Sequence, residues 1–221
     1  MSIAKYIDHT ILAANATSAQ IIQLCEEAKQ YNFFSVCVNS AYVPLAKEHT
    51  NGSEVAVCSV VGFPLGMMDT ASKVFEAKTA IENGADEIDM VINIGRLKDG
   101  DNAYVENEIR QIKEAIGDKV LKVIIETCYL TDDEKITASK LSVNANADFV
   151  KTSTGFGTGG ATYEDIQLMK DAVEGKAALK ASGGVRDFET AQKYIDMGVT
   201  RLGTSSGIKI IQGGTADEGS Y

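Results

Sequence analysis

Short apolar runs alternate with amphipathic segments along the whole chain, and this alternation is the feature that most limits its possible folds. In the amphipathic segments, apolar side chains recur at helical spacing, as Ile109, Ile112 and Ile116 do. The apolar runs predict strands at 7–12, 33–38, 55–61, 87–91, 121–126, 149–151, 177–180 and 201–203. The pattern therefore predicts about eight successive strand–helix units.

The order of these units predicts a parallel sheet that closes into a barrel. The connecting segments lack the signals of antiparallel hairpins. Eight units of about 28 residues each suit a closed (β/α)8 TIM barrel better than an open sheet. No linker or low-complexity stretch divides the 221 residues. We therefore expect a single domain over 1–221, in which residues 212–221 form a flexible tail.

Polar residues mark where three of the predicted helices begin. Thr17 with Gln20, and Thr131 with Glu134, have the spacing of a capping box. Asp187 precedes another helix as its N-cap. These positions predict helix starts directly after residues 17, 131 and 187.

Charge and composition exclude several classes of partner. The formal net charge is -10, so nucleic acid or an anionic membrane would be repelled by the surface. The N-terminal residues lack the apolar core of a signal peptide, and no run approaches the ~20 apolar residues of a spanning helix. The four cysteines have no CxxC spacing, which favours reduced thiols. We therefore expect a cytoplasmic protein that binds neither nucleic acid nor membranes.

Five charged side chains fall on strands where a parallel barrel would place its active site. They are Asp8, Asp89, Lys122, Lys151 and Lys180. In such barrels the active site lies at the carboxyl ends of the strands, so inward polar residues there are functional candidates. A lysine inside a barrel costs free energy unless it is paired. Any one of the five could belong to a structural ion pair, but the set together predicts chemistry.

The pairing of Lys151 with Lys180 indicates amine chemistry. An amine with the ordinary pKa of about 10.4 is almost wholly protonated at pH 7 and is a poor nucleophile. A neighbouring ammonium group and removal from water both favour the neutral amine. Lys151 is therefore predicted to attack a carbonyl and form an imine, with Lys180 as the neighbouring ammonium. Asp89 could exchange protons with the bound intermediate, directly or through water.

Glycine clusters follow the sixth, seventh and eighth predicted strands. They contain Gly155, the pair Gly183 and Gly184, and the run from Gly203 to Ser206. At these strand ends, backbone N–H groups of a barrel commonly hold a phosphate. One cluster alone could serve only the turn, because such turns need glycine anyway. Three at adjacent strand ends predict a phosphate site.

Two lysine motifs carry a resemblance to a known family that covers nearly the whole chain. They read Phe149-Val150-Lys151-Thr152-Ser153-Thr154-Gly155 and Lys180-Ala181-Ser182-Gly183-Gly184-Val185-Arg186. Further matches lie at 7–10, 60–66, 87–91 and 121–127. The chain resembles the 2-deoxyribose-5-phosphate aldolases, class I enzymes that work through a Schiff base. The resemblance implies reversible cleavage of 2-deoxy-D-ribose 5-phosphate to D-glyceraldehyde 3-phosphate and acetaldehyde, in deoxyribose phosphate catabolism.

The resemblance also implies roles for individual residues. Lys151 would be the imine-forming lysine, Lys180 its ammonium partner and Asp89 a proton-relay residue. Lys122 would lie near the same network, and Tyr221, at the chain end, would enter the site on a mobile tail to move a proton at the acetaldehyde methyl carbon. The residues expected to bind substrate are Asp8, Thr10 and Thr154 at the sugar hydroxyls, and Gly155, Gly183, Gly184, Gly203, Ser205 and Ser206 at the phosphate, with Val185 and Arg186 beside it. The family implies a homodimer and needs no metal or cofactor.

Two positions leave alternatives open. Many relatives carry proline where this chain has Ser40, so the loop there could be less rigid. Cys37 could lie near the mouth and react with unsaturated aldehydes, or it could be a buried, inert thiol.

Two other functions compete with an aldolase. A sugar-phosphate isomerase or epimerase would need a carboxylate base or a metal, and a histidine metal cluster is disfavoured because the chain has only His9 and His49. In a non-catalytic phosphate-binding barrel, the lysines would merely neutralise the anion. Trapping of an imine with borohydride would separate the aldolase from both.

Overall fold

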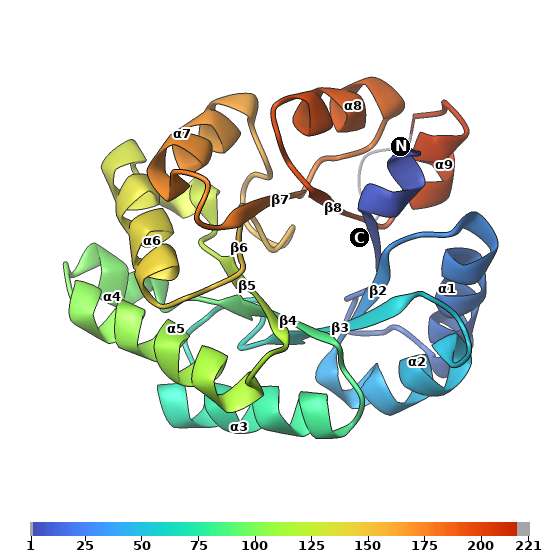
Figure 1. Ribbon diagram of the computed structural model, residues 1–221, viewed down its shortest axis with the longest axis horizontal. Helices are drawn as coiled ribbons and strands as arrows, with labels where there is room; N and C mark the ends of the chain where they lie inside the picture. The colour runs from blue at the N-terminus through green and yellow to red at the C-terminus, as the bar shows by residue number, and fades with distance from the viewer. Residues whose placement is uncertain (1, 216–221) are drawn as a thin grey trace.

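A computed structural model describes residues 2–215 and arranges them around a closed barrel of parallel strands (Figure 1). The strands pair in chain order, and β1 pairs with β8 to close the ring. Their bounds are β1 Ile7–Thr10, β2 Ser35–Val38, β3 Ala56–Val61, β4 Glu87–Val91, β5 Val120–Ile124, β6 Phe149–Lys151, β7 Ala178–Ser182 and β8 Arg201–Thr204. The predicted (β/α)8 TIM barrel is confirmed.

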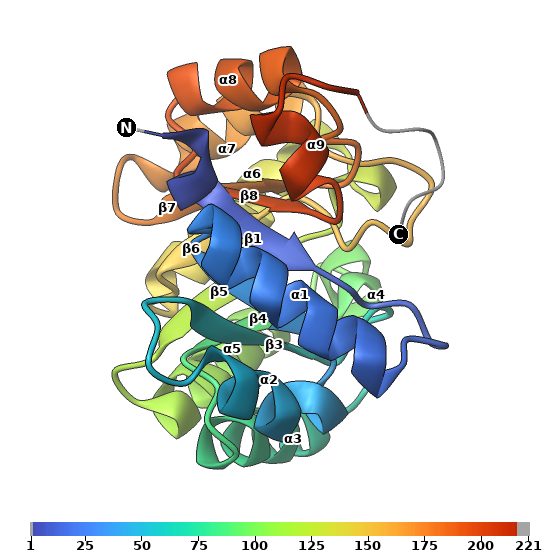
Figure 2. The same ribbon diagram turned by 90° about the vertical axis from the view of Figure 1, so that its right-hand side faces the viewer.

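Helices surround the ring of strands on the outside, and Figure 2 shows α1 lying along β1. Their bounds are α1 Ser18–Tyr31, α2 Val43–Thr50, α3 Thr70–Glu82, α4 Ile94–Lys98, α5 Asn102–Ile116, α6 Asp132–Asn144, α7 Tyr163–Val173, α8 Phe188–Asp196 and α9 Gly207–Ile211. The described residues also form the 3-10 turns η1 Ile3–Tyr6 before β1, η2 Ser40–Tyr42 after β2 and η3 Thr127–Tyr129 after β5. The sequence did not predict α4, because its five residues are too few to show a helical period.

The predicted helix starts at α1, α6 and α8 are confirmed. In the first two, the threonine side chain accepts the backbone N–H of the residue three positions on, whose own side chain accepts the threonine N–H. At α8, Asp187 accepts the backbone N–H of Thr190 at 2.8 Å. Each cap gives a partner to N–H groups that a helix end leaves unbonded. The helices therefore begin where these side chains stand.

The strands present apolar side chains to the helices and polar ones to the barrel interior. Ile88 and Leu121 belong to one large buried cluster with Ile109 of α5. The alternate positions, Asp89 and Lys122, point to the opposite face because successive side chains of a strand alternate. A small separate cluster contains Leu12, Cys37, Cys58 and Val60. The side of the barrel formed by β2 and β3 therefore contributes an apolar cluster, and the other strands contribute charges.

Strand β5 is shorter than predicted, and this moves Glu126. The sequence placed Glu126 on the strand, on the same face as Lys122, but β5 ends at Ile124. The backbone of Glu126 has φ 53° and ψ 68°, the left-handed conformation, and η3 follows directly. Thr127 then donates its N–H to the Thr152 carbonyl beyond β6. The prediction was wrong because the chain leaves the sheet here to bond to the next loop.

The loop at Ser40 is tied down by hydrogen bonds in place of a proline ring. The Ser40 hydroxyl donates to Glu76 Oε1 of α3 at 3.0 Å, and the Gly62 N–H donates to Glu76 Oε2 at 2.8 Å. One carboxylate thus holds the loops after β2 and β3 together.

The last described residues contact the rest of the barrel. Gly214 donates its N–H to the Lys209 carbonyl at 2.9 Å, and Thr215 forms an isolated antiparallel bridge with Asp187. Tyr221 lies outside the described residues, so its predicted role and the flexible tail stay predictions.

Candidate active site

Three lysine side chains converge on the carboxylate of Asp89. Lys151 and Lys180 donate to the same oxygen, Oδ2, at 2.7 and 2.8 Å, and Lys122 donates to Oδ1 at 2.8 Å. The strand register sets this up, because Asp89 pairs with Lys122 and Lys151 pairs with Lys180 on neighbouring strands. All four side chains are buried. The structure therefore brings the four predicted chemical groups together on β4, β5, β6 and β7.

A second set of charges surrounds this cluster and joins distant strands. Lys180 also contacts Asp8 of β1 at 2.5 Å, and Lys122 contacts Glu87 of β4 at 2.7 Å. The guanidinium of Arg201 on β8 bridges Asp8 and Glu87. Glu87 and Arg201 were not predicted from the sequence to belong to the site. Glu87 could have been found, because it shares a strand face with Asp89.

The pKa values of these groups follow from burial opposed by their partners. Burial alone would raise the pKa of Asp89, but the three lysine charges outweigh it and hold the pKa well below its usual range. Burial alone would lower the pKa of Lys180, but Asp8 and Asp89 raise it above its usual value. The same balance, led by Asp89, raises the pKa of Lys122. At neutral pH, these groups therefore carry their charges.

Lys151 differs from the other three cations of the barrel. Within residues 2–215, Lys122, Lys180 and Arg201 each contact two carboxylates. Of these carboxylates, Lys151 contacts only Asp89, and its side chain is 4% exposed, whereas those of Lys122 and Lys180 are 0% exposed. Loss of the Lys151 proton therefore breaks the fewest ion pairs. Lys151 is therefore the one of these four cations with the fewest carboxylate contacts in the described residues.

Residues predicted to hold a phosphate line a small pocket at the ends of β7 and β8. The lining residues are Gly184, Val185, Arg186, Gly203, Thr204, Ser205 and Ser206. Gly183 and Gly184 have φ of 80° and 82°, in the left-handed region that favours glycine. A Cβ on Gly183 would lie 2.8 Å from the Gly160 Cα and 3.7 Å from the Gly155 Cα. Gly155 and Gly183 therefore adjoin the pocket without lining it.

The two threonines predicted to contact sugar hydroxyls lie at the carboxyl ends of β1 and β6. The Thr10 hydroxyl, at the end of β1, donates to the Asp8 carbonyl at 2.8 Å. Thr154 follows β6, and both its N–H and its hydroxyl donate to Glu126. The sequence analysis did not name Glu126 as a site residue. Glu126 lies in the matched segment 121–127, but the turn that directs its side chain towards Thr154 has no signal in the sequence.

Two cysteines approach Asp89 without forming a convincing metal site. Atoms of Cys37, Cys58 and Asp89 lie within 4.8 Å of one another, and Cys58 donates to Asp89 Oδ1 at 3.1 Å. However, a cation at that point would displace the ammonium groups that bind Asp89, and Lys122 lies 3.4 Å from the Cys58 sulfur. The positive charges around these three residues therefore make them a poor binding site for a metal ion. Cys37 is fully buried, which favours the less reactive of the two alternatives for its thiol.

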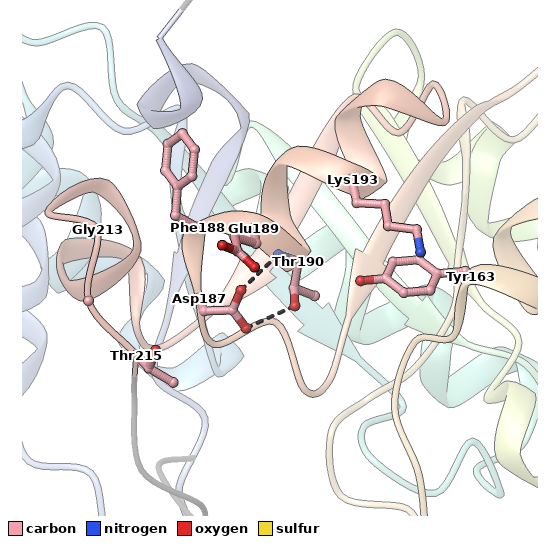
Figure 3. A pocket seen from close by; sticks show the side chains of 9 residues that line it. Tyr163, Asp187, Phe188, Glu189, Thr190, Lys193, Gly213 and Thr215 are labelled. Carbon is pink, nitrogen blue, oxygen red and sulfur yellow. Dashed lines mark hydrogen bonds between the residues drawn. The ribbon is translucent and has the colours of Figure 1, made fainter.

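A pocket outside the barrel contains none of the predicted site residues (Figure 3). It lies between α8 and the segment 213–215 and has a volume of about 600 Å³. The carboxylate of Asp187 binds Thr190 through both oxygens, and the Lys193 ammonium lies 3.7 Å from the centre of the Tyr163 ring. These polar groups are already engaged in capping and ring contacts. The pocket therefore offers little for the predicted chemistry.

Comparison with known proteins gives consistent results over nearly the whole chain. Residues 2–213 match the model of the DeoC/LacD family aldolases. A protein from Finegoldia magna named deoxyribose-phosphate aldolase is 61% identical over 96% of this chain and 100% of its own. One of the same name from Streptococcus uberis is 58% identical over 100% of both chains.

A solved structure agrees with these sequence relatives. The deoxyribose phosphate aldolase from Aeropyrum pernix, described as a tetramer, is 31% identical, has a TM-score of 0.87, and is matched over 95% of this chain and 89% of its own. The family resemblance inferred from the two lysine motifs is confirmed. The chain belongs to the DeoC/LacD family of aldolases.

Proposed function

We propose that this chain is a deoxyribose-phosphate aldolase that cleaves 2-deoxy-D-ribose 5-phosphate reversibly through an imine on Lys151. The observation that carries the proposal is the position of Lys151, which shares Asp89 with two other ammonium groups and has the fewest carboxylate partners. The names of the close relatives support the same substrate.

The reaction begins when neutral Lys151 attacks the C1 aldehyde of the open-chain sugar. Loss of water gives an iminium ion, in which the nitrogen can accept an electron pair. The C2–C3 bond then breaks, its electrons form the enamine, and D-glyceraldehyde 3-phosphate leaves. Protonation of the enamine at C2 and addition of water release acetaldehyde and free Lys151. Lys180 stays protonated beside Lys151, and Asp89 holds the ammonium groups in place.

The pocket at the ends of β7 and β8 would bind the phosphate group of this substrate. Arg186 supplies a positive charge and Gly184 a backbone N–H on the same lining. The substrate would therefore lie across the mouth of the barrel, with the phosphate at β7 and β8 and the aldehyde at Lys151. Fixing one end in this way would hold the aldehyde next to the amine.

Borohydride trapping tests the proposal directly. With 2-deoxy-D-ribose 5-phosphate present, reduction should inactivate the protein, and peptide mapping should find the adduct on Lys151, because only an imine is reduced to a stable amine. Activity should survive chelation. An isomerase or a binding barrel would give no adduct. An adduct on Lys180 instead would contradict the assignment of the nucleophile.

The other predictions about the protein as a whole stay predictions. None of the helices between residues 2 and 215 combines the length and apolar character that a membrane-spanning helix needs. We propose a cytoplasmic, single-domain enzyme.

We also propose that two copies pair through an apolar surface on α3 and the loop before it. The surface contains Met68 and Phe75, which line the same groove and are 42% and 72% exposed. The groove has a volume of about 740 Å³ and runs between this surface and Ala41. Large apolar side chains gathered on one face indicate a protein contact, and a twofold pair buries the same surface of both copies. The tetramer described for the Aeropyrum pernix relative supports self-association in the family.

Exchange of Phe75 for glutamate should separate this pair. Sedimentation equilibrium of the unmodified protein should give about twice the chain mass of 23.6 kDa, and Phe75→Glu should shift it to 23.6 kDa because the contact would bury a charge. Phe188→Glu, a change at an exposed aromatic of α8, is the matched control and should leave the mass unchanged. An unmodified protein of 23.6 kDa would contradict the proposal.

A further inference from the structure

Glu126 combines three properties that are unusual for a glutamate. Its backbone is left-handed, with φ 53°, a conformation that residues other than glycine rarely adopt. The residue is 2% exposed. It lies two residues after the end of β5, at the same rim of the barrel as Lys151. Strain and burial of this kind concentrate at functional sites.

The carboxylate of Glu126 is built into the loop after β6. Both carboxylate oxygens accept the Thr154 N–H, with the Thr154 nitrogen 3.2 Å from Oε1 and 3.3 Å from Oε2. Oε2 also accepts the Thr154 hydroxyl in a short hydrogen bond. Gly157 lets the loop come this close, because a Cβ there would lie 3.3 Å from the Glu126 carboxyl carbon and 2.8 Å from the Cys128 sulfur. Glu126 therefore fixes both the position of Thr154 and the direction of its hydroxyl proton.

The hydrogen bonds of Thr154 leave it able to accept one more. Its hydroxyl has one proton to donate and two lone pairs with which to accept. The proton goes to Glu126, and one lone pair takes the Phe156 N–H at 3.0 Å. Among residues 2–215, no further donor reaches the other lone pair. A substrate hydroxyl at this threonine would therefore act as the donor.

We propose that Thr154 and Glu126 together remove the proton of the substrate hydroxyl next to the bond that is cleaved. This step rests on the proposed function. The O–H bond of the C3 hydroxyl breaks and its proton passes to Thr154 Oγ1, while the Thr154 proton passes to Glu126 Oε2. The oxygen forms the new carbonyl, the C2–C3 bond breaks, and its electrons enter the iminium on Lys151. In aldol addition the protons move back, so no other reactant is needed.

The charges around the two acids favour Glu126 over Asp89 for this step. Burial raises the pKa of Glu126, and the hydrogen bonds from Thr154 and the charge of Lys151 only partly oppose it. In contrast, the pKa of Asp89 is held well below its usual range. A carboxylate whose pKa lies closer to neutral is the better proton acceptor. In this relay Thr154 would touch the substrate, and Glu126 would act through it as a positioning residue.

The test separates cleavage from the part of the reaction that needs no C3 hydroxyl. Exchange of acetaldehyde methyl protons in D2O requires only the imine and the enamine. Glu126→Gln and Thr154→Val should each slow cleavage about 10²-fold while the exchange rate and borohydride trapping at Lys151 change less than about 2-fold. The double variant should lose no more than either single one, because the two residues act as a unit.

Two further variants serve as controls. Thr154→Ser keeps the hydroxyl and should retain most of the cleavage rate. Cys128→Ala alters a neighbour of Glu126 that carries no proton in the relay, and should behave as the unmodified protein. Undiminished cleavage in Thr154→Val, or exchange that falls in step with cleavage, would overturn the relay. If the unmodified protein neither cleaves the sugar nor traps an imine, the proposed function fails instead.

Discussion

Exchange of Lys151 for alanine should reduce cleavage of 2-deoxy-D-ribose 5-phosphate by a factor on the order of 10⁴ or more, or at least about 5 kcal/mol of transition-state stabilisation. Among the buried lysines of the barrel strands in residues 2–215, Lys151 has the fewest carboxylate partners, because Lys122 and Lys180 are each held by two. Steady-state rates and borohydride trapping should fall together. Phosphate binding should persist, because the pocket at β7 and β8 does not include Lys151.

The fold should survive the loss of Lys151. Asp89 keeps Lys122 and Lys180 as partners, so no carboxylate is left buried without a cation. Circular dichroism and inorganic phosphate binding by calorimetry check this. Lys98→Ala, which removes a lysine that pairs with Glu134 on the surface, is the matched control and should retain full activity. Full aldolase activity in Lys151→Ala would show that the imine forms elsewhere.

Exchange of Asp89 for asparagine should destabilise the protein by about 3–5 kcal/mol. The amide keeps the shape of the side chain but removes the charge that Lys122, Lys151 and Lys180 share. Buried ammonium groups would then face each other with fewer counter-charges. Urea unfolding at pH 7, followed by circular dichroism, measures the change. Turnover should fall as well, because the lysines lose their common anchor.

An exposed aspartate provides the comparison for this change. Asp132 pairs with Lys135 on α6 and its side chain is 72% exposed, so Asp132→Asn should cost less than about 1 kcal/mol. Equal effects of the two substitutions would mean that the buried charges of the barrel contribute no more than a surface pair. That result would contradict the role given to Asp89 as the shared counter-charge.

Much of the fold could be predicted because local patterns and global arrangement agree. Strand and helix periods alternate without interruption, and the side-chain caps at Thr17, Thr131 and Asp187 stand where the helices begin. The ends of the strands were predicted less accurately. The end of β5 depends on a hydrogen bond between Thr127 and Thr152, which lie 25 residues apart, and no local pattern reports such a contact.

The candidate site was predictable where chemistry alone singles out a residue. Lysines at strand ends are costly, so Lys151 and Lys180 stood out. Arg201 and Glu87 did not, because a charge at the start of a strand is ordinary until the barrel closes around it. Lys73 of α3 is a related case. A lysine in a helix with other charged residues is expected to be exposed to solvent. In the structure it is fully buried and binds Glu108 of α5 at 2.8 Å.

The bridge from Arg201 to Asp8 and Glu87 makes the charge balance of the barrel depend on the synthesis of β8. Its three members come from the first, fourth and last strands, so a nascent chain cannot neutralise Asp8 in the native way until residue 201 has left the ribosome. A barrel without β8 would keep Lys180 at Asp8 and Lys122 at Glu87, but it would leave the other oxygen of each carboxylate buried without the cation that binds it here, which is unfavourable. Chains that lack β8 are thus kept from settling into a stable, inactive core, and β8 completes the bridge.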